Sequence, residues 1–470
     1  LTGGGWGHDR CVGCGRLSLA LIPLTRMHHA VLYTSGKQIL SERGHADKTN
    51  KSPVTMTSIF DEASDDTLFE NRSVLDTEYV PDNLVEREDE IEELRHLLQP
   101  AIQGARPADT FLVGNHGVGK TVSMKWIFEE LDKYEPGEDL EIIPEYMSCQ
   151  STVTTEYNFL VESINSLRRH RSDEFSRFPS TGHSLENTAR QWYDELEQLC
   201  ESTGADTVVL ILGLDEVDNL DRTDRNDIFD RILRATNHVS FEELHISLLG
   251  TSNEAGILST ENLDSGVRSR LRAQELAYEP YDGKTMQSVV QQRIDKAFSE
   301  GYYEDAVVTL LGALGAKHEG DARMALDLLS KAGEIADRED ASQLTEEHVH
   351  RAKEQWFNRK VKTAVESASS TAETALAALI WAEIDGEGQF SEGPITAEVY
   401  DYYQRLGGEK IRRTVRRHIE DFEDARILTS EYVERDQKYK CFSTLHDHEL
   451  ILSHMLETIE STPLAEYVDG

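Results

Sequence analysis

Residues 114–121 read G-N-H-G-V-G-K-T and match the pattern G-x-x-x-x-G-K-[ST] in full, which constrains the fold more than any other feature. In such a loop the glycines let backbone N–H groups wrap around phosphates, the lysine reaches the outer phosphate oxygens, and the final hydroxyl suits Mg²⁺. An apolar run precedes the loop at 110–113, and apolar residues recur with helical spacing over 124–131. This context predicts a site for ATP or ADP with Mg²⁺. The expected nucleotide contacts are Gly117, Val118, Gly119, Lys120, Thr121 and Val122, with Thr121 also on the metal.

Two further apolar runs end in polar residues that can act beside the phosphates. Residues 207–214 form a near-continuous apolar run, as expected for a strand buried on both faces of a parallel sheet. The run ends in Asp215, a candidate Mg²⁺ ligand, and Glu216, which can polarise the attacking water. A third run, 245–251, leads to Asn253, whose amide can orient the same water. Together with strands expected near 140–149 and 274–280, these runs predict a five-stranded parallel α/β sheet.

Composition restricts the compartment and the partners. The chain has 48 basic and 87 acidic residues, for a formal net charge of −39. Such a chain resembles a cytoplasmic protein of a salt-in halophile, in which concentrated salt screens the repulsion between carboxylates. No apolar run reaches the roughly 18 residues that a membrane-spanning helix requires, so no membrane association is expected. Five cysteines do not make a disulfide framework, and Cys149, Cys200 and Cys441 are expected to be small core residues.

Residues 1–55 differ from the rest of the chain. They carry seven basic and three acidic residues, whereas residues 56–470 have a net charge of −43. We expect a disordered extension, or upstream sequence wrongly joined to a chain that starts at Met56. Cys11 and Cys14 lack a second cysteine pair at zinc-site spacing, so an accidental CxxC is the favoured interpretation.

The motifs resemble, in their order along the chain, those of the archaeal AAA+ replication initiators related to the origin-recognition and cell-division-control proteins. The resemblance runs from about residue 70 to the C-terminus and is more specific than any one motif. The matching segments are an N-terminal box at 74–81 and 86–88, a G-x-R-P lead-in at 104–107, Walker B at 214–218, sensor 1 at 251–253 and sensor 2 at 320–327.

This resemblance implies an AAA+ base, an α-helical lid and a C-terminal winged helix. It places Tyr281 beside the adenine and Arg293 among the nucleotide contacts. It also places Arg323 at the γ-phosphate, where an arginine is suited because its planar donor fork stays charged.

The chain departs from the family at Gly266, where an arginine is usual. Arg268 and Arg270 follow, and residues 269–270 resemble the arginine-finger position of other AAA+ proteins. Such an arginine is donated across a subunit interface and stabilises charge on the transferred phosphoryl group. Arg270 is the candidate catalytic residue, Arg268 is the alternative, and an ordinary surface helix is the third interpretation.

The C-terminal part is predicted to bind DNA. Helices expected at 372–383, 396–405 and 409–425, followed by strands around a turn at 434–437, fit a winged helix-turn-helix. Residues 410–419 contain five basic residues and no acidic one, a local reversal of the charge of the chain. Such a helix can enter a major groove. The candidate DNA contacts are Lys410, Arg412, Arg413, Arg416 and Arg417 on the helix, with Lys438 and Lys440 on the wing.

The pattern also predicts which face of this helix is buried. Ile411, Val415, Ile419 and Phe422 are expected on one buried face. The alternative to DNA binding is a solvated face, in which Arg416 and Arg417 pair with acidic residues four positions on.

The favoured function is that of an ATP-dependent initiator that binds replication-origin duplex DNA and is switched by ATP binding and hydrolysis. A replicative helicase and further copies of the chain on DNA are the expected partners. The alternatives are a transcription regulator that uses ATP only as a conformational ligand, or a signalling or clamp-loading AAA+ ATPase. The expected domains are a base at 56–280, a lid at 281–362 and a winged helix at 366–470.

Overall fold

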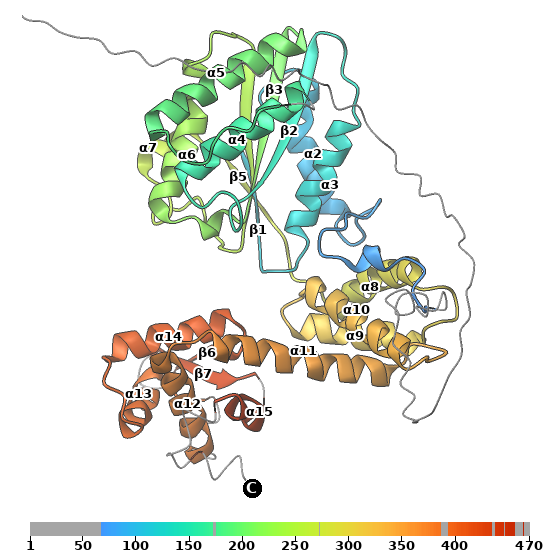
Figure 1. Cartoon of the computed structure of the whole chain (residues 1–470), viewed down its shortest axis with the longest axis vertical. Helices are drawn as coiled ribbons and strands as arrows, with labels where there is room; N and C mark the ends of the chain where they lie inside the picture. Colours follow the sequence, from blue (N-terminus) through green and yellow to red (C-terminus); the bar gives the residue numbers. More distant parts are fainter. Residues whose placement is uncertain are drawn as a thin grey trace, which may run out of the picture. The chain divides into compact units, whose positions relative to one another are not determined.

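A computed structural model describes residues 67–172, 175–271, 273–386, 393–434, 438–445, 447–455 and 464 (Figure 1). The expected extension at 1–55, with Cys11 and Cys14, lies outside the described residues, as does the tip of the predicted wing turn at 435–437. Within the described part of the chain, no helix is both long and apolar enough to cross a membrane.

A parallel sheet organises the first half of the described chain, as predicted. Its five strands lie in the order β2-β3-β4-β1-β5 and every neighbouring pair is parallel. Carboxyl ends of parallel strands share one edge of a sheet, so the residues that follow β1, β3 and β4 come together. The strands are β1 (Thr110–Val113), β2 (Leu140–Ser148), β3 (Thr207–Asp215), β4 (Leu244–Ser252) and β5 (Gln274–Ala277).

Helices cover both faces of this sheet (Figure 1). Val209 and Ile211 of β3 pack in the core shared with α2 and α3, whereas Leu210 and Leu212 pack with α4, α5 and α6. Burial on both faces explains the unbroken apolar run of β3. The elements around the sheet are α2 (Glu88–Ile102), α3 (Lys120–Asp132), α4 (Glu156–Arg171), α5 (Leu185–Thr203), η2 (Val217–Asn219), α6 (Arg222–Arg234), η3 (Ala235–Asn237) and α7 (Ser265–Arg270).

A second core lies among the helices after β5. These are α8 (Gly283–Ala297), α9 (Asp305–Lys317), α10 (Ala322–Arg338) and the first part of α11 (Glu346–Glu366). The short helix η1 (Arg72–Leu75) also belongs here, because Leu68, Val74 and Leu75 are buried against these helices. Residues 68–75, which lie within the expected base at 56–280, therefore contribute to the core of the lid helices.

A third core is formed by the C-terminal elements. The order of three helices and an antiparallel pair of strands agrees with the prediction. The helix α11 does not end near Lys362 but continues to Glu366, and its residues Val361 and Val365 are buried in this third core. The elements are α12 (Ser370–Asp385), α13 (Thr396–Arg405), α14 (Arg412–Asp424), β6 (Leu428–Glu434), β7 (Lys438–Thr444) and α15 (His448–Ser453).

The three cysteines of the described chain are buried, as predicted. Cys149 and Cys200 lie in the core between the sheet and α4 to α6, and Cys441 lies on β7; all three are free thiols.

One ion pair between α4 and β2 predicts a pH-dependent stability. His170 Nε2 lies 2.6 Å from Oε1 of the buried Glu145, and this contact raises the pKa of His170. A raised folded-state pKa contributes stability that is fully present below the unfolded value and is lost as pH rises through the folded value. We expect His170→Asn to lower the melting temperature at pH 6 and to have a smaller effect at pH 9. An equal loss at both pH values would show that packing, not charge, is responsible. Calorimetry at constant salt measures this difference.

Candidate nucleotide and DNA sites

The loop between β1 and α3 has the backbone that a phosphate loop requires. Gly117 and Gly119 have φ values of 72° and 99°, the left-handed region that favours glycine. At Gly117 a Cβ would lie 1.9 Å from Asp321 Oδ1, so the loop and the lid approach too closely for any side chain. The loop leads directly into the N-terminus of α3, whose free backbone N–H groups favour bound phosphate.

Lys120 is buried beneath this loop. Its Nζ donates to Gly114 O at 2.8 Å, to Asn115 O at 2.6 Å and to Asn253 Oδ1 at 3.0 Å. Burial lowers the pKa of this ammonium to about 8. Phosphate oxygens would supply the negative charge that these neutral oxygens lack, so a nucleotide would favour the protonated form.

Asp215 ends β3 and is surrounded by hydroxyl groups. Its Oδ1 accepts from Thr121 Oγ1 at 2.9 Å and from Thr251 Oγ1 at 2.6 Å, and its Oδ2 accepts from Tyr146 Oη at 2.9 Å. A carboxylate beside a threonine hydroxyl provides the oxygen donors that Mg²⁺ prefers in a phosphate site. The structure thus places the two predicted metal residues, Thr121 and Asp215, in direct contact.

Glu216 and Asn253 directly follow the carboxyl ends of the neighbouring strands β3 and β4. Glu216 adopts φ 59°, and its N–H donates to Thr251 Oγ1 at 2.7 Å. Burial, followed by the charge of Asp215, raises the pKa of the Glu216 carboxyl. Asn253 is held by Asp218, which accepts from its backbone N–H at 3.0 Å and from its Nδ2 at 2.9 Å. Asp218 therefore fixes the amide orientation that leaves Asn253 Oδ1 facing Lys120.

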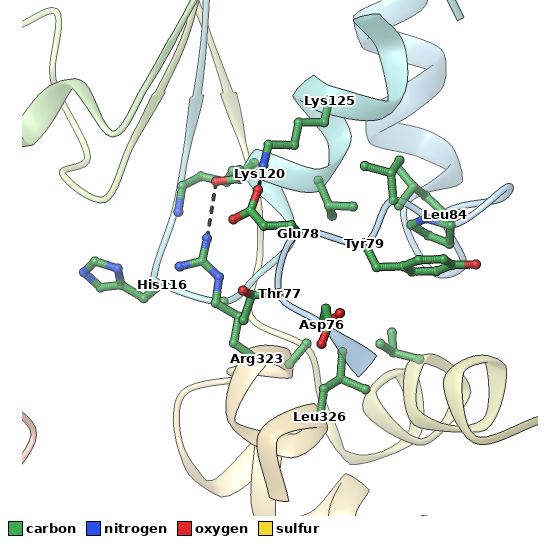
Figure 2. Close-up of a pocket in the computed structure, with 18 of the residues that line it drawn as sticks. Asp76, Thr77, Glu78, Tyr79, Leu84, His116, Lys120, Lys125, Arg323 and Leu326 are labelled. Atoms are coloured by element: carbon green, nitrogen blue, oxygen red, sulfur yellow. Dashed lines mark hydrogen bonds and ion pairs between the residues drawn. The ribbon is translucent and has the colours of Figure 1, made fainter. Parts of the chain in front are cut away.

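The lid brings Arg323 to this edge. Its Nη1 lies 3.8 Å from Glu216 Oε1, and its Nη2 donates to Thr121 Oγ1 at 3.5 Å. Figure 2 shows the guanidinium pointing from the lid toward the phosphate loop and Lys120. The helix α10 that carries it is capped by Asp321, and Ala322 N donates to Gly117 O at 3.1 Å. The sensor 2 segment is thus hydrogen-bonded to the P-loop itself.

The other two lid candidates, Tyr281 and Arg293, line the same cavity. Tyr281 is buried, and the Arg87 guanidinium lies 4.0 Å from its ring centroid. Arg293 is buried, donates to Val74 O at 3.1 Å and lies 4.6 Å from the ring centroid of Tyr79. These aromatic and guanidinium groups form a region suited to a planar base.

The cavity that these residues enclose is large enough for a nucleotide. Its volume is about 530 Å³, within the usual range of ligand pockets. Its walls come from the segment 75–85, the phosphate loop, the ends of β2 and β3, and the lid helices α8 and α10 (Figure 2). The predicted residues of this cavity are Gly117, Gly119, Lys120, Thr121, Val122, Asp215, Glu216, Asn253, Tyr281, Arg293 and Arg323, whereas Val118 is buried in the core beneath it.

The arginine-finger candidates lie apart from this cavity. Arg268 and Arg270 are exposed on α7, and Arg270 forms an ion pair with Asp230 of α6. Neither lines the cavity that contains Lys120. This position is compatible with action on a neighbouring copy or with an ordinary surface helix, so the role of Arg270 stays a prediction.

The basic residues of α14 face solvent. Arg412, Arg413, Arg416 and Arg417 are exposed on the helix, whereas Val415, Ile419 and Phe422 are buried on its other face. Arg416 Nε lies 3.2 Å from Glu420 Oε1, the pairing that the solvated-face alternative expects. An exposed pair of this kind contributes little and can be broken by a phosphate at small cost.

Two expectations about this helix are wrong. Ile411 is not part of the apolar face: it is 66% exposed, because it is the N-cap residue and has an extended backbone with ψ 155°. Lys410 is not on the helix either, since α14 begins at Arg412, but it is exposed just before the helix N-terminus.

The two wing lysines differ in their surroundings. Lys438 is exposed and lies 4.7 Å from the ring centroid of Tyr432, which is itself 64% exposed. Lys440 is half-buried and its Nζ lies 2.7 Å from Glu423 Oε2. Lys438 is therefore the more available of the two for a phosphate.

Comparison with known proteins agrees with this geometry. Residues 83–240 match the AAA ATPase domain model, and residues 287–354 match the Cdc6 AAA+ ATPase-type lid domain model. An ORC1-type DNA replication protein 2 of Haloarcula marismortui is 32% identical over 82% of this chain and 89% of its own length. The chain belongs to the ORC1-type DNA replication protein family. An ORC1-type protein 10 of Halobacterium salinarum is 30% identical over 77% of this chain and 85% of its own length.

A solved structure also matches most of the chain. The Aeropyrum pernix ORC1 protein in complex with DNA is 29% identical, covers 83% of this chain and 97% of that chain, and superposes with a TM-score of 0.65. This match covers most of the chain and confirms the family that the motif order indicated.

Two residues of this ORC1-type site were not among the predicted site residues. Asp218 follows the Asp215-Glu216 pair by two positions, and only the structure shows that it holds Asn253. Arg87 belongs to the N-terminal box and had no predicted contact, yet its Nε donates to Val118 O at 3.0 Å and its Nη2 to Glu279 O at 2.7 Å. It thus ties the phosphate loop to the segment between β5 and the lid.

Proposed function

We propose that this protein is an ATP-dependent initiator of DNA replication that binds origin duplex DNA through α14 and the β6–β7 wing. The observation that carries the proposal is that one chain combines a complete P-loop site with five positive residues at 410–417, four of them on α14, in an otherwise strongly acidic chain. The A. pernix ORC1 relative, whose structure contains DNA, supports the same assignment.

In this proposal ATP binds between the base and the lid. Lys120 and the backbone of residues 117–122 hold the phosphates, and Arg323 reaches the γ-phosphate. Tyr281 lies beside the adenine, and Arg293 is a further contact to the nucleotide. Bound Mg²⁺ would offset phosphate charge, held by Thr121 and Asp215. Glu216 accepts a proton from the attacking water, which Asn253 orients. Because Arg323 belongs to the lid, loss of the γ-phosphate removes an attraction that holds the lid to the base.

DNA binding in this proposal is concentrated on one surface. A chain with net charge −43 over residues 56–470 is repelled by DNA over most of its surface. The N-terminal residues of α14 would read base edges in the major groove, while Lys410 and Lys438 contact phosphates. This surface belongs to neither of the ATP-binding parts, which are a base at 56–280 and a lid at 281–362. Residues 68–75 contribute to the core of the lid.

The partners and compartment follow from this role. We infer a cytoplasmic protein that helps to recruit a replicative helicase and associates with further copies on DNA. Arg270 on the exposed helix α7 would then act on the nucleotide of a neighbouring copy.

Genome-wide DNA occupancy of the tagged protein tests the function. We expect occupancy at sites where nascent DNA synthesis begins, measured in the same cells. Occupancy at promoters away from such sites, with altered transcription there after depletion, would instead favour the transcription regulator. Absence of DNA occupancy would favour a signalling or clamp-loading ATPase.

A further inference from the structure

Tyr146 belongs to none of the motifs of the nucleotide site, yet it contacts Asp215, the carboxylate that is proposed to hold the metal. Its Oη donates to Asp215 Oδ2 at 2.9 Å, whereas the two threonine hydroxyls both donate to Oδ1. The side chain lines the nucleotide cavity and is 37% exposed. Among the described residues, the hydroxyl of Tyr146 is thus the group that donates a hydrogen bond to Oδ2 of Asp215.

The strand pairing explains how a tyrosine reaches this position. Tyr146 of β2 lies opposite Gly213 of β3, and Ser148 lies opposite Asp215. Side chains at i and i+2 share one face of a strand, so Tyr146, Gly213 and Asp215 are on the same face. A Cβ on Gly213 would lie 2.5 Å from the ring of Phe128 in α3, so a larger residue does not fit beside Tyr146 on this face of the sheet.

A cation from α3 packs on the ring. Lys125 Nζ lies 4.9 Å from the ring centroid of Tyr146 and also forms an ion pair with Glu78. Glu78 belongs to the segment 75–85 that forms one wall of the cavity (Figure 2). The ring is therefore fixed between the end of β3 and the helix that follows the phosphate loop, and its hydroxyl has a defined direction.

We propose that Tyr146 is a positioning residue that orients Asp215 for the divalent cation bound with the nucleotide. Groups that hydrogen-bond a metal-binding carboxylate hold its oxygens in place before the metal arrives, and their loss commonly costs about 10- to 100-fold in metal affinity or activity. Without the hydroxyl, Asp215 Oδ2 loses its donor, and the hydrogen bonds that remain on the carboxylate hold Oδ1 alone among the described residues. This inference rests on the proposed ATP site.

The test is Mn²⁺ binding, measured by electron paramagnetic resonance, to the full chain saturated with a non-hydrolysable ATP analogue. We expect Tyr146→Phe to weaken Mn²⁺ binding by about 10-fold. Binding of ADP in the presence of EDTA should be unchanged, because the hydroxyl is directed at Asp215 and not at the phosphate loop. Tyr134→Phe is the matched control, since Tyr134 is 45% exposed after α3 and outside the cavity.

The possible results separate this inference from the proposed function. Equal Mn²⁺ affinity in Tyr146→Phe and wild type would overturn the positioning role and leave the ATP site intact. If the wild type bound neither nucleotide nor Mn²⁺, the proposed function would fail and the inference with it. Weaker ADP binding in EDTA together with a lower melting temperature would indicate a structural role for the ring and would also overturn the proposal.

Discussion

Glu216→Gln is expected to slow ATP hydrolysis by about 100- to 10,000-fold, the range in which a general base contributes. The carboxylate lies at the end of β3 beside Asp215, and its raised pKa favours acceptance of a proton from water. Glutamine keeps the shape of the side chain but cannot take up the proton. ATP binding should therefore remain close to wild type, since Lys120 and the loop backbone are untouched. Single-turnover hydrolysis and equilibrium binding of labelled ATP measure the two effects separately.

Two further variants make this result interpretable. Glu254→Gln changes an exposed carboxylate near the same edge of the sheet and should hydrolyse ATP normally. Lys120→Ala should lose ATP binding, because the buried ammonium is the charge beneath the phosphate loop. Hydrolysis at the wild-type rate in Glu216→Gln would show that another group activates the water.

The double variant Arg412→Ala with Arg416→Ala is expected to weaken specific DNA binding by about 100-fold or more. Each arginine contact to a base edge contributes about 1–3 kcal/mol, and every 1.4 kcal/mol is a factor of ten. Both side chains are exposed on α14, and neither contributes to the buried face that includes Val415. ATP hydrolysis should be nearly unchanged, because the cavity that contains Lys120 includes no residue of α14. Fluorescence anisotropy on a footprinted site measures the affinity.

A charge-matched control is available outside the C-terminal elements. Arg95 and Arg338 are exposed on α2 and α10, and replacing both by alanine removes the same charge from another part of the protein. This control should bind DNA as the wild type does. Because the two arginines are assigned to base edges, the double variant should keep the salt dependence of the wild type, which reports the phosphate contacts. Unaltered affinity in the double variant would place recognition on another surface, such as the base.

Much of this protein could be predicted from local sequence because the relevant physics is local. The loop at 114–121 needs its glycines for backbone conformation, and Gly117 and Gly119 have the positive φ values expected of it. The strand β3 is apolar throughout because both of its faces are buried, so its position and its terminal Asp215 were readable without a structure.

Contacts between distant segments could not be predicted in this way. Residues 68–75 pack in the lid core although the chain reaches the lid more than 200 residues later, and no periodicity in so short a segment indicates its partner. The exposure of Ile411 follows from the residue at which α14 begins, and sequence patterns locate helix ends least well. Val361 and Val365 lie in the third core because α11 continues past the expected boundary.

The polar network around the metal residues shows the same division. The sequence identifies Thr121 and Asp215 because each lies at a fixed place in a recognisable strand or loop. Tyr146 and Asp218 have no such signal: one reaches Asp215 through the register of β2 against β3, and the other reaches Asn253 through the pairing of β3 with β4. Strand register is set by packing over the whole sheet, so only the tertiary structure decides which side chains complete the site.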